Sequence, residues 1–398
     1  MGPPIPYGLT RASWRRGMRD LDDAGRLLAL PNPPVNFILL LYAELISMYT
    51  IHLPRRARKH YLAGDPPFLN DFSRDEVHQL FGFRTHVQLR RVMIALGVPA
   101  IIRTRERYVY PGESAFLLML VRLRDGRRWS QLERIFHRDG THLSAINLYM
   151  VEWLYTNHSL PRLSNMAWVK ARMPLYAQCI VAKLKSIYPQ DKWNLIPIDI
   201  WSFIDGTIRP CAKPSSRSFP GLNLQVDLYS GYKKIHGVKY QSLHTCDGLC
   251  AHMYGGMGAR RHDTSLLRLS NVMSILFNMF LPGDMIYRIM GDPAYARTWL
   301  TCTGFKGNNL TDNETTFNKM MSSVRIAVEW GFKDINCTWR WLNDKHRNKL
   351  GETPLRKHYM NATFLSNLIV CVTGGTQTSA FFECEPPTLE EYLLMTNP

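Results

Sequence analysis

The sequence predicts an α/β protein, α+β overall, in which a mixed sheet flanked by helices follows an all-α N-terminal region. Between residues 73 and 155, apolar side chains recur at helical spacing. After residue 189 the pattern of apolar residues changes. Residues 193–208 are rich in Ile, Trp and Phe without helical spacing, and residues 226–254 alternate polar and apolar side chains. Strands that come first and then alternate with helices predict a mixed sheet covered by helices.

Length and charge limit the class of protein. The 398 residues, 45% of them hydrophobic and 20% charged, can bury a large core and exceed the size of one ordinary domain. Because 49 Lys and Arg face 32 Asp and Glu, the net charge of +17 favours nucleic acid as a partner, with a soluble basic protein as the evenly weighted alternative. The longest apolar stretch, residues 35–49, is too short to span a bilayer, so we expect no membrane contact.

Eight cysteines lie at irregular spacing between residues 179 and 384, and we expect them to be reduced thiols inside the cell. One segment offers two His and two Cys in nine residues: His244, Cys246, Cys250 and His252. Asp247-Gly248 between them predicts a hairpin turn, whose strands point alternate side chains to opposite faces. We therefore do not expect these four side chains to surround one zinc ion.

Three regions are expected along the chain: a helical arm at residues 1–65, a helical region at 66–165 and a sheet-containing domain at 166–398. The arm should hold a helix at residues 35–51 and a basic cluster at residues 55–59, which is either a nuclear-import or phosphate-contacting patch or a solvated helix end. In the second region we predict two short helices within residues 73–96, a helix that Ser114 caps and Gly126 ends, and a short helix from Ser130 to residue 136.

A turn at residues 137–141 and a longer helix at residues 142–155 complete a unit that resembles a helix-turn-helix. Basic side chains flank the turn, which favours DNA contact, although helical hairpins are also common as plain packing units. Beyond residue 189 we predict strands at 193–208 and on both sides of Asp247-Gly248, a helix at 264–280, a strand at 285–290 and a helix at 315–333.

Three carboxylates are the candidate catalytic residues. Asp205 and Asp292 each end an apolar strand before a Gly or Pro, and Glu329 lies at the border of the buried stripe of its helix. Singly, each has a simpler explanation, because an Asp at a strand end caps turns and Glu329 can pair with Arg325 one turn away. Together they would repel unless a cation joined them, and their hard oxygen ligands select Mg²⁺ or Mn²⁺.

Five separated segments of this sequence resemble the Harbinger superfamily of DDE transposases and the nucleases derived from them. The first and third acids lie in Phe203-Ile204-Asp205-Gly206-Thr207 and Val328-Glu329-Trp330-Gly331-Phe332, and the second lies in Gly291-Asp292-Pro293-Ala294-Tyr295. The other two segments are residues 229–239 and 260–263. The acids are 87 and 37 residues apart, which matches the family, whereas Pro293 stands where many relatives have Ser.

The resemblance implies an RNase H-like catalytic domain whose triad of Asp205, Asp292 and Glu329 holds two Mg²⁺ or Mn²⁺ ions. Asp263 is a possible auxiliary ligand, with helix capping as its simpler role. The implied activity is cleavage, and possibly rejoining, of DNA phosphodiesters by a transposase or endonuclease. The alternative is a domesticated DNA-binding or regulatory protein that keeps the fold without catalysis. A Myb-like partner protein, nuclear localisation and a homo-oligomer are further expectations.

Basic and aromatic side chains near the acids are candidate DNA contacts, although Lys on an exposed hairpin also discourages edge pairing. A second stretch, residues 339–349, is expected to face DNA rather than the core. We find no Walker loop, Rossmann fingerprint or nucleophile elbow, which counts against nucleotide hydrolysis, hydride transfer and serine hydrolysis. The candidate DNA contacts are Arg209, Tyr232, Lys233, Lys234, His236, Lys239, Arg260, Arg261, Arg340, Lys345 and Arg347.

Overall fold

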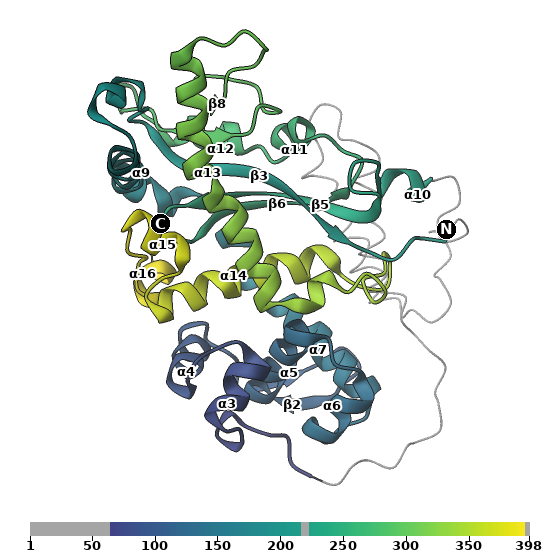
Figure 1. Ribbon diagram of the computed structural model, residues 1–398. Helices are drawn as coiled ribbons and strands as arrows, with labels where there is room; N and C mark the ends of the chain where they lie inside the picture. The colour runs from purple at the N-terminus through teal and green to yellow at the C-terminus, as the bar shows by residue number, and fades with distance from the viewer. Residues whose placement is uncertain (1–63, 216–222, 395–398) are drawn as a thin grey trace.

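A computed structural model describes residues 64–215 and 223–394, which form a smaller helical part and a larger part built on a sheet (Figure 1). The predicted helix at 35–51 and the basic cluster at 55–59 lie outside the described residues. None of the described helices is both long and apolar enough to cross a membrane.

The helical part contains the short helices that the apolar spacing predicts. They are α3 (Arg74–Glu76) with its continuation η2 (Val77–Phe81), α4 (His86–Ala95), α5 (Gly112–Asp125), α6 (Trp129–Phe136) and α7 (Gly140–Leu154). The single turn η1 (Leu69–Asp71) before them was not predicted. Gly126 ends α5 with a φ of 64°, as predicted, because a residue without a Cβ adopts this left-handed conformation freely. The order of α6, turn and longer α7 also agrees with the prediction, and α7 packs against both α5 and α6.

Two predictions for this part are wrong. Strands β1 (Ile101–Arg103) and β2 (Val109–Pro111) pair as a hairpin, so the region is not all-α. The predicted caps are also displaced, because α5 begins at Gly112 and α6 at Trp129, before Ser114 and Ser130. The hairpin fixes the start of α5, since Gly112 N donates to Ala100 O at 2.9 Å and a Cβ at Gly112 would lie 1.7 Å from Pro99 O.

The sheet is mixed, as predicted, and β3 (Ile200–Pro210) lies at its centre. On one side β3 pairs antiparallel with β5 (Ile235–Thr245), which in turn pairs with β6 (Cys250–Gly258) and the short β4 (Tyr229–Ser230). On the other side β3 pairs parallel with β7 (Arg288–Gly291), which pairs parallel with β8 (Thr301–Thr303). The strand order is therefore β6-β5-β3-β7-β8.

Helices surround this sheet (Figure 1). Contacts with β3 come from α9 and α13, contacts with β5 from α11 and α13, and contacts with β6 from α8 and α14. Their bounds are α8 (Leu160–Ser164), α9 (Met173–Ile187), α10 (Leu224–Asp227), α11 (Asp263–Leu269), α12 (Val272–Met279), α13 (Asp312–Thr338), α14 (Leu355–Thr373), α15 (Gln377–Phe382) and α16 (Leu389–Leu394). Single turns lie at η3 (Tyr155–Ser159), η4 (Ala167–Arg172), η5 (Gln190–Leu195) and η6 (Arg340–Asn343).

Local sequence signals account for most of these elements. The Asp247-Gly248 turn joins β5 and β6, as predicted. The apolar stripe of α13 is buried at Met321, Val324 and Val328, as its spacing predicts. One predicted helix is divided, because Asn271 adopts a φ of 55° and separates α11 from α12.

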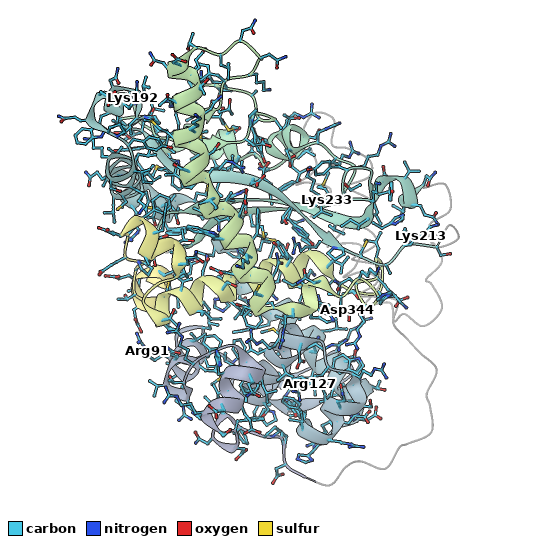
Figure 2. All side chains as sticks on the ribbon, viewed as in Figure 1. Arg91, Arg127, Lys192, Lys213, Lys233 and Asp344 are labelled. Carbon is cyan, nitrogen blue, oxygen red and sulfur yellow. The ribbon has the colours of Figure 1, made fainter. Side chains whose placement is uncertain are left out.

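The two parts contact each other where η6, α14 and α16 pack against α5, α7 and α4 respectively. An exposed ion pair of 2.8 Å joins Arg91 of α4 to Glu390 of α16 (Figure 2 labels Arg91). Such exposed pairs contribute little, about 0–1 kcal/mol. Buried apolar side chains on both parts therefore supply most of the attraction.

Two histidines of the sheet, His244 of β5 and His252 of β6, are buried. His244 of β5 packs against α13, where its ring centroid lies 5.3 Å from that of Phe332. Neither of its ring nitrogens has a hydrogen-bond partner among the described residues. Burial lowers the pKa of His244 to about 4, and burial lowers the pKa of His252 to about 4 as well. Both side chains are therefore neutral in the folded protein at neutral pH.

We expect this arrangement to make the protein sensitive to acid. Below pH 6.5 the folded state binds fewer protons than the unfolded state. The contribution of the neutral histidines to the free energy of unfolding is therefore full above pH 6.5 and decreases as the pH drops towards 4. Each of the two histidines contributes a loss of about 3 kcal/mol across this window. His244→Leu should make the free energy of unfolding less dependent on pH between 6.5 and 4, as measured by urea titration at several pH values.

His346→Gln serves as the control, because this histidine is exposed and lies outside the core. If both variants kept the pH dependence of the unmodified chain, His244 would not be a source of acid sensitivity.

Candidate active site

Strand register brings the first two acids together. In the parallel pairing, Phe203 of β3 lies opposite Met290 of β7, so Asp205 and Asp292 each come two residues after a matched position. Asp292 directly follows β7, as predicted. Its Oδ1 accepts a hydrogen bond of 3.0 Å from Ala294 N, which fixes the turn after the strand.

Asp205 does not end its strand, contrary to the prediction. β3 continues to Pro210 because its antiparallel pairing with β5 runs on, with Asp205 opposite Ser242 and Pro210 opposite Gly237. Only the parallel pairing with β7 stops before Asp205. Asp205 therefore lies inside β3, just beyond the point where the pairing of β3 with β7 ends.

Asp205 lies near two other acidic side chains, those of Asp292 and Asp263. Burial is the largest influence on its pKa and raises it, and the nearby Asp292 and Asp263 raise it further. The Gly206 N–H, which donates to Asp205 Oδ1 at 2.7 Å, and the cation of Arg325 act in the opposite direction. The Asp205 side chain is 25% exposed, so solvent reaches it from one side.

Arg325 joins the first acid to the third. Its Nη1 lies 3.3 Å from Asp205 Oδ2, and its Nη2 lies 3.4 Å from Glu329 Oε1. The simple pairing of Glu329 with Arg325 along the helix is therefore present, but the same guanidinium also reaches across to β3. The sequence showed only the helical spacing of four residues and gave no sign of the second contact.

The three carboxylates do not form a compact ligand group. Within residues 64–215 and 223–394, no set of three His, Cys, Asp or Glu side chains that includes Asp205, Asp292 or Glu329 has its ligand atoms all within 4.8 Å of one another. Glu329 is the most open of the three, with 58% of its side chain exposed. A spread set of carboxylate oxygens with unbalanced negative charge is nevertheless suited to hard divalent cations.

Asp263 lies beside Asp205 rather than capping a helix. His262 is the N-cap of α11, and no side chain caps this helix, so the capping role is wrong. Instead Asp263 Oδ1 pairs with Lys239 Nζ at 3.0 Å. A Cβ on Gly206 would lie 2.1 Å from the same oxygen, so only glycine allows Asp263 to approach β3 this closely.

Tyr295 is a residue near the acids whose role the sequence did not indicate. Its hydroxyl donates to Gln241 Oε1 at 3.4 Å, and its ring lies against Gly291. Burial raises the pKa of Tyr295 strongly, and the charges of three nearby Asp residues raise it further. Tyr295 therefore stays protonated, and its side chain next to the carboxylates is uncharged.

The candidate DNA contacts divide into exposed and internal groups. Lys239 is only 9% exposed and donates to Arg261 O at 2.9 Å, so its assignment as a DNA contact is corrected to a partner of Asp263. Arg209 is half-buried and donates to Thr207 Oγ1 at 2.7 Å and Asn343 Oδ1 at 3.1 Å, so its guanidinium is used inside the protein. Exposed side chains are Tyr232, Lys233, Lys234, Arg260, Arg340 and Lys345, and partly exposed ones are His236, Arg261 and Arg347.

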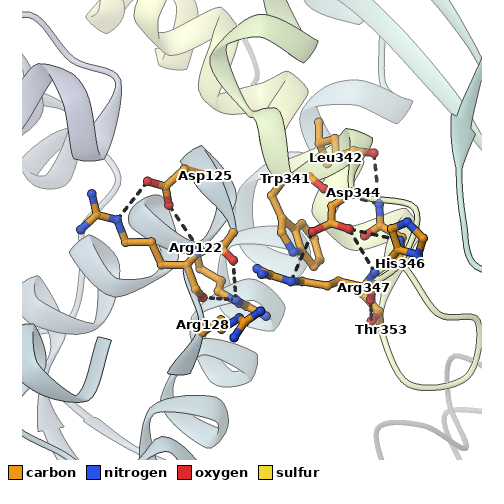
Figure 3. Close-up of polar contacts among 12 residues, drawn as sticks. Arg122, Asp125, Arg128, Trp341, Leu342, Asp344, His346, Arg347 and Thr353 are labelled. Carbon is orange, nitrogen blue, oxygen red and sulfur yellow. Dashed lines mark hydrogen bonds and ion pairs between the residues drawn. The ribbon is translucent and has the colours of Figure 1, made fainter. Parts of the chain in front are cut away.

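The expectation for residues 339–349 is partly wrong, because both tryptophans are buried. Trp341 of η6 packs against the helical part, where it lies near Arg122 (Figure 3). A Cβ on Gly126 would lie 2.2 Å from the Trp341 ring. The Arg122 guanidinium lies 4.5 Å from the ring centroid of Trp129 and 5.7 Å from that of Trp341. Burial lowers the pKa of Arg122 to about 10, so this cation stays charged inside the contact.

Comparison with known proteins gives one match. Residues 204–372 match the family described as DDE superfamily endonuclease, and this segment contains Asp205, Asp292 and Glu329. The match confirms the resemblance at the level of this superfamily. No curated protein and no solved structure matches the chain significantly.

We expect Gly206→Ala to disturb the acidic site. The added Cβ would collide with Asp263 Oδ1 and force that carboxylate away from Lys239. The free energy of unfolding should fall by about 1–3 kcal/mol, as measured by denaturant titration. Gly231→Ala is the matched control, since nothing lies within 4 Å of its added Cβ. Equal losses in both variants would show that the close approach of Asp263 is not required.

Proposed function

We propose, from the premise that residues 204–372 belong to the DDE superfamily endonucleases, that the chain is a metal-dependent DNA endonuclease of the Harbinger transposase type. The proposal is supported by the matching register that places Asp205 of β3 next to Asp292 after β7, and by Arg325, which links Asp205 to Glu329 of α13. The strand order β6-β5-β3-β7-β8, antiparallel on one side of β3 and parallel on the other, supports an RNase H-like fold.

In this proposal Asp205, Asp292 and Glu329 hold two Mg²⁺ or Mn²⁺ ions. Such a pair of ions activates a water or a 3′-hydroxyl and stabilises the leaving oxygen of a phosphodiester in an in-line displacement. Repulsion among Asp205, Asp292 and Asp263 supports the assignment, because it leaves negative charge that a cation can balance. Asp263 is the proposed auxiliary residue, and Lys239 fixes its position through their ion pair.

Arg325 has a supporting role. Its guanidinium touches both Asp205 and Glu329 and so supplies positive charge to the acids from the protein itself. This contact favours the ionised form of Asp205, as its effect on the pKa shows. Arg325 therefore favours the carboxylate form of Asp205, the form that binds a metal ion.

DNA is the proposed substrate, and the net charge of +17 supports it. Tyr232, Lys233 and Lys234 form the exposed tip between β4 and β5, where a ring that is 88% exposed stands next to two ammonium groups. Aromatic rings stack on unpaired bases and ammonium groups bind phosphates. The α6–α7 unit is a second proposed contact. A nuclear location, a Myb-like partner and self-association complete the proposal as the resemblance implies them.

The first test removes single ligands from the triad. In Asp205→Asn, Asp292→Asn and Glu329→Gln, Mn²⁺-dependent nicking of supercoiled DNA should fall by at least about 100-fold, since each change removes charge that positions the ions. Mn²⁺ should also raise the melting temperature of the unmodified chain more than that of Asp205→Asn.

Glu352→Gln is the matched control, because Glu352 is an exposed acid that forms an ion pair with Lys349, away from the three acids. Folding of each variant is checked by circular dichroism. If the unmodified chain bound DNA but cut none with either metal, and Mn²⁺ left its melting temperature unchanged, the domesticated DNA-binding alternative would replace the enzyme.

The second test addresses the exposed tip. Lys233→Glu combined with Lys234→Glu should weaken DNA binding by at least about 10-fold at 0.1 M salt and reduce the slope of log K against log salt by roughly 2. Fluorescence anisotropy over a range of salt concentrations measures both quantities. Lys185→Glu combined with Lys192→Glu is the charge-matched control, since Lys192 lies at the other end of the sheet part from Lys233 (Figure 2) and Lys185 is also exposed. An equal loss in the control would mean that only overall charge matters.

A further inference from the structure

Three cysteines that are distant in the sequence meet at one end of the sheet. Cys179 belongs to α9, Cys246 follows β5 in the turn to β6, and Cys384 follows α15. Their Sγ atoms all lie within 4.8 Å of one another. From this cluster we infer a binding site for a soft divalent metal, Zn²⁺, held by three thiolates and separate from the carboxylate site.

The distances suit this metal. Zinc bonds to sulfur at about 2.3 Å, so two thiolates on a tetrahedral ion lie about 3.8 Å apart. A spread of up to 4.8 Å therefore needs only small side-chain movements to close around an ion. Cys246 and Cys384 are buried and Cys179 is partly exposed, so an ion and a water molecule as fourth ligand can enter from the side of Cys179.

Polar contacts between nitrogen and oxygen atoms hold the three elements together. Tyr176 of α9 donates to Asp247 Oδ2 at 2.7 Å and so ties the helix to the turn that carries Cys246. Arg172 pairs with Asp247 at 3.5 Å and donates to Glu385 O at 2.7 Å, next to Cys384. The backbone around the thiols is therefore fixed before any metal binds. Figure 1 shows α9 and α15 next to each other at this end of the sheet.

The ligand type separates this cluster from the carboxylates. Soft thiolates select zinc, whereas the oxygens of Asp205, Asp292 and Glu329 suit hard ions such as Mg²⁺. A disulfide between two of the three cysteines would use only one pair and leave the third thiol without a partner. One zinc ion uses all three and links α9, the β5–β6 turn and the segment after α15.

The test measures metal in the full-length protein, purified without chelators. Elemental analysis should find about one zinc per chain, and Co²⁺ added in its place should give the intense near-ultraviolet absorption of thiolate-to-cobalt charge transfer. Cys179→Ser and Cys384→Ser should each keep less than a tenth of the zinc. Cys302→Ser, buried, and Cys337→Ser, exposed, are the matched controls and should keep it.

The proposal is overturned if the unmodified chain holds no zinc and gives no cobalt–thiolate absorption. Equal zinc loss in the control variants, or a thiol count two below that of the reduced chain, would overturn it as well. Asp205→Asn separates the two sites, because it should lose nicking and keep its zinc. Failure of the zinc proposal therefore leaves the proposed nuclease activity untouched.

Discussion

The acidic site depends on β3 having partners of unequal length on its two sides. Its antiparallel pairing with β5 continues to Pro210, whereas its parallel pairing with β7 stops at Phe203. Asp205 therefore lies beside a gap in the sheet, and Asp292 leaves β7 at the matching position. Backbone hydrogen bonds hold the two acids together against the repulsion of their own charges. Arg325 and Lys239 supply the positive charge nearest to the cluster.

Local patterns predicted much of the fold. The apolar stripe of α13, the Asp247-Gly248 turn and the Gly126 helix end each follow from the conformational preference of a few neighbouring residues. The order of strands and helices predicted a mixed sheet for the same reason. All three candidate acids could also be selected from the sequence, since each lies next to a recognisable apolar segment, although their roles rest on the resemblance.

Contacts between distant segments could not be predicted. Lys239 looks like a surface residue of a hairpin, yet it is buried against Asp263 because α11 returns to cover β5. Gly206 looks like a turn residue, yet its lack of a Cβ makes room for the Asp263 carboxylate inside a continuous strand. Tryptophans among basic residues suggest a surface for DNA, but Trp339 and Trp341 are buried. In each case the deciding neighbour comes from another part of the chain.

The position of Trp341 has a mechanical consequence. α13 carries Glu329, ends at Thr338 and leads within two residues into η6, whose Trp341 is wedged against Gly126 of the helical part. The third acid and the helical part are thus connected by one helix and one tightly packed ring, with no flexible linker between them. A displacement of α5 at Gly126 therefore moves the C-terminal end of α13, the helix on which Glu329 lies.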